Sequence, residues 1–265
     1  MKNIKIYQID AFTDRLFSGN PAAICILDKW IDDDLMQSIG KENNLAETAF
    51  VVPRDKDFEI RWFTPTTEVD LCGHATLAAA FVLLDILDYP NSELKFHSIK
   101  SGLLTVSKKK GMLFLDFPTD TLELTNEGLK DKITKCIGIK PIELFKGKTD
   151  YIAIIDSEQL LLNIRVDLEE ISSLNARGLI VTAQGDSSDF VSRFFAPQSG
   201  INEDPVTGSA HTSLIPLWSN KLGRKQLTAK QLSNRGGQLF CEYKDERCLI
   251  GGKAKLYLTG EIYLD

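Results

Sequence analysis

Short sequence signatures of nucleotide and metal binding are absent from this chain. It has no G-x-x-x-x-G-K-[ST] phosphate-binding loop and no G-x-G-x-x-G segment. Only three histidines occur, His74, His97 and His211, and none of them belongs to an H-x-x-x-H or paired Cys/His spacing. The sequence therefore predicts neither a metal nor an organic cofactor.

Paired cysteines and long apolar segments are absent as well. The five cysteines are widely scattered and include no C-x-x-C pair, which is typical of reduced thiols. The first residues lack the apolar core of a signal peptide, and the longest apolar run, residues 77–87, is interrupted by Asp85. We therefore expect a cytoplasmic protein that does not associate with membranes.

The chain also has no surplus of basic residues. Lys and Arg number 31 against 37 Asp and Glu, which gives a formal charge of −6 and does not favour nucleic acid as a partner. The hydrophobic fraction of 43% and the charged fraction of 26% are typical of a soluble globular protein. A length of 265 residues is sufficient for two domains.

Short segments with period-2 alternation dominate the first 118 residues and indicate β-strands. They cover residues 5–9, 22–27, 48–52, 58–63, 103–106 and 112–117. One amphipathic helix is expected to begin near Asp32–Asp34, whose carboxylates suit a helix N-terminus, and to end before Leu45. A second helix, residues 75–87, is apolar on nearly every side, which indicates that other elements enclose it.

After Pro118 a similar pattern begins again. Leu129, Ile133 and Ile137 mark one face of a helix. The other elements expected here are strands at 151–155, 160–166, 179–182, 189–195, 239–243, 247–251 and 254–264, a helix at 167–175 and a mostly apolar helix from Ser209 to Gly223.

The two halves of the chain share one local pattern. Phe63-Thr-Pro65 leads to Gly73-His-Ala75 and an apolar helix, and Phe195-Ala-Pro197 leads to Gly208-Ser-Ala210 and another. This correspondence favours a duplicated domain in which each half wraps a curved mixed sheet around one central helix. A cleft between the halves is then expected to receive both helix starts.

Five segments of the sequence occur together and in a particular order. They are G-N-P-A-A at 19–23, N-L-A-E-T-A-F at 44–50, I-R-W-F-T-P at 60–65, E-V-D-L-C-G-H-A-T at 68–76 and E-D-P-V-T-G-S-A at 203–210. This set resembles the signature of the PhzF (phenazine-biosynthesis-like) family. The resemblance implies an α+β, diaminopimelate-epimerase-like fold with two similar domains, at 1–118 and 119–265, and a homodimer. The last strand is free to return to the first domain.

Glu47 stands at the start of a predicted apolar strand, after a polar turn. From its position alone it is either an ordinary exposed carboxylate or a general acid/base beside an apolar wall. The resemblance implies the second role, because the catalytic glutamate of the family lies in the same E-T-A-F context.

Gly73 and His74 precede the first apolar helix, where exposed backbone N–H groups can bind an anion. His74 alone is either a structural residue or a group that orients a carboxylate or relays a proton. The resemblance implies an active-site role for His74 and substrate contacts for Gly73.

Asp204-Pro205 has two interpretations as well. The pair suits a helix N-cap followed by the first helical residue. The resemblance instead implies that Asp204 is a catalytic or substrate-binding acid. Gly208 and Ser209 correspond to Gly73 and His74 at the second helix and are predicted to bind the substrate.

Cys72 stands where the related diaminopimelate epimerases carry the first of two catalytic thiols. The second half offers no matching thiol, since Val206, Thr207 and Ser209 occupy that region. A two-thiol mechanism is therefore not expected, and Cys72 is interpreted as a small, semi-buried residue.

The sequence thus predicts a cofactor-independent isomerase that moves a proton between carbons of a small carboxylate or amino-acid-like substrate, with Glu47 as general acid/base. The ligand is expected to be a small anion or zwitterion. Two alternatives remain open: an amino-acid epimerase or racemase that pairs Glu47 with Asp204, and a small-acid binding protein without turnover.

Overall fold

The computed structural model describes residues 2–264. Contacts within the chain divide it into two compact units, Met1–Phe117 with Ile250–Asp265, and Pro118–Leu249. The return of the C-terminal segment to the first unit is the outcome that the sequence left open. Among the described residues, no helix combines the length and the apolar composition needed to span a bilayer.

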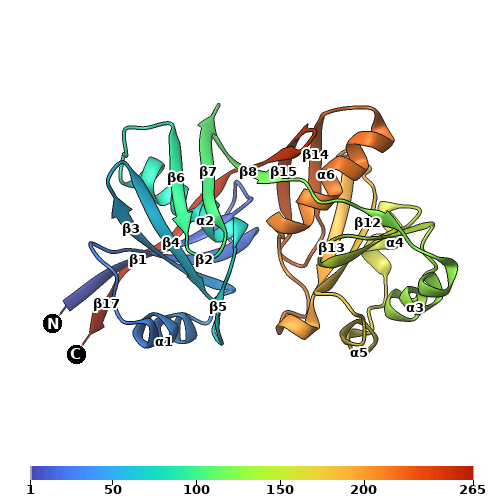
Figure 1. The fold of residues 1–265 in the computed structure, drawn as a ribbon, viewed down its shortest axis with the longest axis horizontal. Helices are drawn as coiled ribbons and strands as arrows, with labels where there is room; N and C mark the ends of the chain where they lie inside the picture. Colours follow the sequence, from blue (N-terminus) through green and yellow to red (C-terminus); the bar gives the residue numbers. More distant parts are fainter. Residues whose placement is uncertain (1, 265) are drawn as a thin grey trace. The chain divides into compact units, whose positions relative to one another are not determined.

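The first unit is mainly β-structure with two helical segments (Figure 1). Its elements are β1 (Lys2–Ala11), β2 (Asn20–Ile26), α1 (Asp33–Asn43), β3 (Glu47–Arg54), β4 (Asp57–Phe63), β5 (Glu68–Val69), α2 (Gly73–Phe81), a π-helical turn η1 (Val82–Ile86), β6 (Glu93–Ser98), β7 (Gly102–Lys109), β8 (Met112–Pro118) and β17 (Ala254–Leu264).

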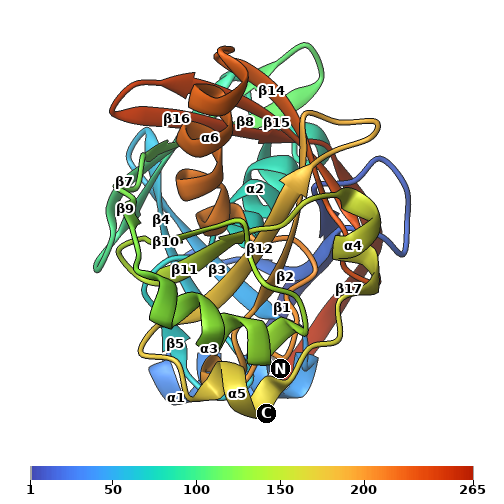
Figure 2. The ribbon, with the colours of Figure 1, turned by 90° about the vertical axis from the view of Figure 1, so that its right-hand side faces the viewer.

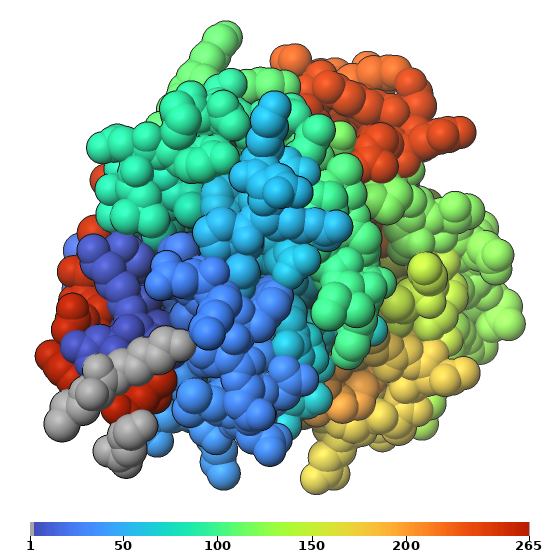
Figure 3. Space-filling model, turned by 60° about the vertical axis from the view of Figure 1, so that its left-hand side comes forward, coloured from blue at the N-terminus to red at the C-terminus, as the bar shows by residue number. Residues whose placement is uncertain are grey.

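These strands form one mixed sheet. From β1 onward the pairings are antiparallel with β2, parallel from β2 to β3, antiparallel to β4, parallel to β6 and antiparallel to β7 and β8. On its other edge β1 pairs antiparallel with β17, so the two ends of the chain lie side by side in one unit. The dark-blue and red atoms are adjacent for this reason in Figure 3.

Helices cover both faces of this sheet. The amphipathic helix α1 packs Met36 and Ile39 against one face, together with Phe50 and Phe63 from the strands. Asp32 caps α1 by accepting a hydrogen bond from the backbone N–H of Asp34, as the acidic start predicts. The central helix α2 contacts β1, β2 and β3, and nearly all its residues are buried. The prediction that other elements enclose this apolar helix is therefore confirmed.

The second unit repeats the arrangement. Its elements are β9 (Glu123–Leu124), α3 (Glu127–Ile137), β10 (Glu143–Lys146), β11 (Asp150–Ile154), α4 (Glu158–Asn163), α5 (Leu168–Ser172), β12 (Gly178–Gln184), β13 (Phe190–Phe195), a 3-10 turn η2 (Pro197–Ser199), α6 (Gly208–Leu222), β14 (Gln226–Gln231) and β15 (Gly237–Lys244). A further strand, β16 (Arg247–Gly252), includes the boundary between the units.

Strand directions in the second unit follow the same series as in the first. From β10 to β15 the pairings run antiparallel, parallel, antiparallel, parallel and antiparallel. In each unit the central helix is the crossover between two parallel strands: α2 joins β4 to β6, and α6 joins β13 to β14. The matching topology confirms two similar halves, each with a mixed sheet and a central helix.

The two faces of the second sheet carry different cores. Alternate residues of β12, Leu179 and Val181, join α3, α4 and α5 in one apolar cluster. Figure 2 shows α3 and α5 on the near side of this unit. Thr182 faces the other way and accepts a hydrogen bond at 2.9 Å from Trp218 of α6, whose indole ring stacks on Phe190.

One predicted strand is wrong. The apolar run at 160–166 was expected to be a strand, but residues 158–163 form helix α4. Ser157 caps this helix by accepting a hydrogen bond from the N–H of Leu160 at 3.3 Å. Leu161 and Ile164, three residues apart, are buried, whereas Leu160 and Leu162 are 38% and 50% exposed. The buried residues of this run therefore follow helical spacing, but the exposed leucines beside them hide this periodicity in the sequence.

Candidate functional site

Glu47 is the first residue of β3 and is only 9% exposed. Parallel pairing places it opposite Ala22 of β2, and Asn44, with a left-handed backbone conformation, ends α1 just before it. Next to it, Thr48 accepts a hydrogen bond from the side chain of Asn43 at 3.0 Å, which fixes the start of the strand. The alternative of an ordinary exposed carboxylate is therefore wrong.

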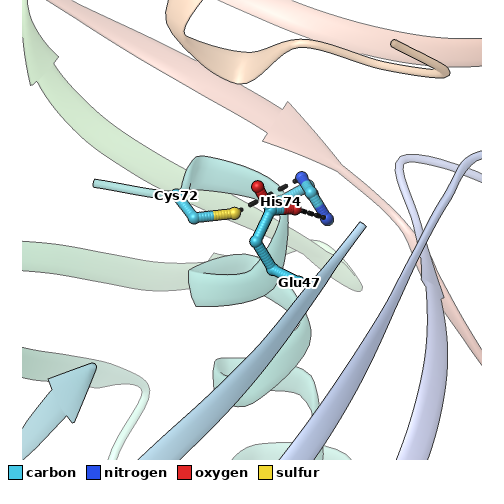
Figure 4. Close-up of side chains that lie close together, drawn as sticks. All are labelled: Glu47, Cys72 and His74. Atoms are coloured by element: carbon cyan, nitrogen blue, oxygen red, sulfur yellow. Dashed lines mark hydrogen bonds and ion pairs between the residues drawn. The ribbon is translucent and has the colours of Figure 1, made fainter. Parts of the chain in front are cut away.

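His74 lies in the first turn of α2, and its side chain points at Glu47 (Figure 4). The Nε2 atom of His74 is 3.2 Å from Oε2 of Glu47. Both atoms are buried, and neither has a hydrogen-bond partner of acceptable geometry. The contact is therefore an ion pair that leaves hydrogen-bonding capacity on each side.

Cys72 precedes α2 and contacts the other nitrogen of the same imidazole ring. Its Sγ atom lies 3.5 Å from Nδ1 of His74, so the sulfur and the carboxylate of Glu47 each face a different ring nitrogen (Figure 4). Burial, supported by the negative charge of Glu47, raises the pKa of Cys72 to about 11. Cys72 is buried, with 5% of its surface exposed, rather than semi-buried.

The surroundings of His74 act on its charge in opposite directions. Burial lowers the pKa of His74, but the neighbouring Cys72 and Glu47 raise it well above the usual 6.5. The protonated ring can donate from Nε2 toward the carboxylate, so Glu47 and His74 form a buried acid/base pair.

The helix start at Gly73 adds a partial positive charge. No side chain caps α2. Its first-turn N–H groups carry the positive end of the helix dipole, which favours an anionic ligand.

In the second unit, Asp204 is held in a buried hydrogen-bond network. The Thr207 hydroxyl donates to Oδ2 of Asp204, and the Gln231 amide donates to Thr207 Oγ1 at 3.1 Å and to the Asp204 carbonyl at 2.8 Å. Helix α6 begins only at Gly208, with Thr207 in the cap position, so the interpretation of Asp204 as its N-cap is wrong.

Ser209, in the first turn of α6, has a charged neighbour. Its hydroxyl oxygen accepts a hydrogen bond from Arg177 at 3.1 Å. Arg177 is in turn bound through two nitrogens to the buried carboxylate of Asp150. As at α2, no side chain caps α6.

The structure thus brings together Glu47, Gly73 and His74 in the first unit. It places Asp204, Gly208 and Ser209 on one segment of the second unit. The convergence of these two groups on one ligand stays a prediction. The sequence did not predict the contact of Cys72 with His74 or that of Gln231 with Asp204. The C-G-H spacing could have indicated the first contact. Gln231 lies on β14, outside every motif, so nothing in the sequence indicated the second.

Comparison with known proteins identifies the family. The model of the phenazine biosynthesis-like proteins matches residues 9–260 of the sequence. The chain belongs to this family. A Pseudomonas aeruginosa relative, named an uncharacterized isomerase, is 47% identical over 98% of this chain and 99% of its own. A PhzF-family crystal structure from Enterococcus faecalis shares 45% identity at a TM-score of 0.96, covering 99% of this chain and 100% of that chain.

The likeness of fold extends beyond close relatives of this phenazine biosynthesis-like protein. A hydroxyproline epimerase from Agrobacterium vitis is 11% identical, with a TM-score of 0.61 over 99% of this chain and 93% of that chain. This similarity concerns the fold alone and agrees with the predicted α+β, epimerase-like class. The names of the relatives place the chain among isomerases, which argues against a binding protein without turnover.

Three of the described residues could also hold a metal ion. Ligand atoms of Glu47, Cys72 and His74 lie within 4.8 Å of one another, and all three residues are buried. They constitute the one such group of three His, Cys, Asp or Glu side chains found over residues 2–264. In the arrangement observed, each ring nitrogen of His74 faces a different partner.

Proposed function

We propose that this isomerase transfers a proton between two carbons of a small carboxylate or amino-acid-like substrate, with Glu47 as the general acid/base. The observation that carries the proposal is the buried contact of 3.2 Å between Glu47 and His74, in which both facing atoms keep unused hydrogen-bonding capacity. A carboxylate held in this way can accept a proton and return it.

The proposed reaction is balanced without a cofactor. The Glu47 carboxylate takes a proton from a carbon next to an unsaturated or carboxyl group, and the C–H electron pair moves into that group. Protonated Glu47 then returns the proton to another carbon, so the substrate is neither oxidised nor reduced. His74 donates toward the substrate oxygen that carries the developing charge. The start of α2 at Gly73 favours an anion beside that oxygen.

The second group of residues is proposed to bind the same substrate. Asp204, held by Thr207, suits an amino group, while Gly208 and Ser209 at the start of α6 suit a carboxylate. If Asp204 instead takes a proton from the opposite side of one carbon, the reaction is an epimerisation. We keep epimerisation as the second candidate because both carboxylates are buried.

Two further expectations belong to this proposal. The protein is predicted to be a cytoplasmic homodimer. Its predicted ligands are small anions or zwitterions, with no nucleic acid or membrane partner.

The test of the proposed function is substrate screening in D2O with wild-type protein and Glu47→Gln. We expect wild type to incorporate deuterium into one cyclic or linear amino acid or carboxylate, followed by proton NMR. Because Gln keeps the shape but cannot titrate, Glu47→Gln should bind the same compound and turn it over about 10²–10⁴-fold more slowly.

Glu123→Gln, in the exposed strand β9, is the matched control and should react like wild type. Deuterium at the new carbon together with a moved double bond identifies isomerisation, whereas inversion at one labelled carbon identifies epimerisation. Near-wild-type turnover by Glu47→Gln would remove Glu47 from the mechanism.

A further inference from the structure

The cluster of Glu47, Cys72 and His74 presents one oxygen, one sulfur and one nitrogen ligand from three buried side chains. Two of the ligand atoms, Glu47 Oε2 and His74 Nε2, are buried without a hydrogen-bond partner. Polar atoms in this situation cost free energy, and a cation held by the cluster would give the Glu47 oxygen a partner. We propose that the cluster binds one Zn²⁺ ion and that the bound ion blocks the base. Only the block rests on the proposed function.

The distances within the cluster suit this ion. In tetrahedral zinc sites the metal lies about 2.3 Å from sulfur and about 2.0–2.2 Å from nitrogen or oxygen, so the ligand atoms are roughly 3.3–3.6 Å apart. Cys72 Sγ and His74 Nδ1 are 3.5 Å apart, and the ligand atoms of the three residues all lie within 4.8 Å of one another. One ion takes only one ring nitrogen, and Nδ1 is the nitrogen that faces the sulfur. The carboxylate of Glu47 then turns toward the same ion, and water supplies the fourth ligand.

The charges balance when the ion binds. The Cys72 thiol loses its proton to solvent as the Zn–S bond forms, and His74 coordinates as neutral imidazole. A thiolate and a carboxylate then neutralise the two positive charges of the ion, which favours binding at a buried site. A single oxygen ligand does not suit Mg²⁺ or Ca²⁺, whereas sulfur and imidazole nitrogen suit Zn²⁺.

Occupation of the cluster has a direct consequence for the proposed proton transfer. The oxygen of Glu47 that would accept the substrate proton is held by the ion. Bound Zn²⁺ therefore inhibits the enzyme, and a chelator restores activity. The bound ion is a means of inhibition and contributes nothing to the reaction itself.

The experiment is equilibrium dialysis of the full-length, chelator-treated protein against Zn²⁺, with Co²⁺ as a spectroscopic substitute. We expect one Zn²⁺ per chain and, with Co²⁺, a sulfur-to-metal charge-transfer band that reports the thiolate ligand. Cys72→Ala should lose that band and bind Zn²⁺ at least about tenfold more weakly. Cys25→Ala is the matched control, because Cys25 is a buried cysteine of the same unit that belongs to a purely apolar cluster.

Several outcomes would overturn the proposal. These are no stoichiometric Zn²⁺ in wild type, a charge-transfer band that persists in Cys72→Ala, or equal weakening in Cys25→Ala. If Cys72→Ala does not fold, two other measurements test the proposal: Zn²⁺ binding by His74→Gln, which should also be weaker, and the presence of the charge-transfer band in wild type. Dialysis needs no turnover, so its result is independent of the proposed function. Proton transfer that requires Zn²⁺, rather than being inhibited by it, would refute the inhibitory role.

Discussion

His74 and His211 each lie near the start of a central helix, α2 in the first unit and α6 in the second. Both are buried, but only His74 has acidic and sulfur neighbours that favour its protonated form. Burial without such a neighbour lowers the pKa of His211 to about 4. His211 is therefore neutral at pH 7, and its Nδ1 atom donates to the carbonyl of Thr207 at 2.8 Å.

The neutral state of His211 predicts a loss of stability in mild acid. The unfolded chain binds a proton at this residue below about pH 6.5, whereas the folded chain does so only near pH 4. The contribution is therefore fully present above pH 6.5 and is lost as the pH falls to about 4. It amounts to about 3 kcal/mol of the free energy of unfolding.

Urea unfolding of wild type and His211→Gln between pH 7 and pH 4 measures this contribution. Because Gln does not titrate, wild type should lose about 3 kcal/mol more than the variant over that range. Because the two proteins have the same carboxylates, the effect of these groups on the free energy of unfolding cancels in the comparison. Parallel stability curves would show that folding does not lower the pKa of His211.

At the scale of elements, an arginine–glutamate pair occurs at the same place in each unit. Arg61 of β4 binds Glu68 through two hydrogen bonds of 2.8 and 2.9 Å, and Arg193 of β13 binds Glu203 through two of 2.7 and 2.9 Å. Each pair joins the strand before the central helix to the loop that carries the predicted site residues. Each guanidinium also lies over a phenylalanine ring, Phe63 or Phe195.

Double-mutant cycles should give both pairs a similar coupling energy. We expect about 1 kcal/mol between Arg61→Met and Glu68→Gln, and about the same between Arg193→Met and Glu203→Gln, from chemical unfolding. The pairs are partly buried and bidentate, which is the geometry in which such bonds contribute. The exposed pair Lys225–Asp245 is the control and should give almost none. Coupling in one unit alone would argue against an equivalent role.

At the scale of the whole molecule, the duplicated topology gives each unit one central helix with an uncapped start. We predict that one anion binds to both starts at once. Titration of labelled protein with acetate should then shift the amide resonances of Gly73 and Gly208 with a single dissociation constant. The amide of Gly223, at the opposite end of α6, should not move.

Glu47→Gln provides a further control for this titration, since loss of the acid/base group should leave anion binding by the N–H groups intact. Two different dissociation constants, or a response of one helix only, would contradict a shared site. That result would also remove Asp204 and Ser209 from the proposed substrate contacts.

The sequence by itself determined the features that depend on local chemistry. The acidic start of α1, the apolar composition of α2 and the alternation of β4 follow from capping, burial and pleating, which act over a few residues. The position of Glu47 left two roles open, and the resemblance of its motif to the family implied the catalytic one, which stays a prediction.

Only the tertiary structure decided which distant residues meet. The run at 160–166 became helix α4 because Leu161 and Ile164 face a core built by other elements. Cys72 and Glu47 each face a nitrogen of His74 because the packing of α2 against β3 brings together residues 25 or more positions apart. Gln231 reaches Asp204 through the parallel pairing of β13 with β14. Such contacts depend on how whole elements pack, and no local pattern in the sequence records them.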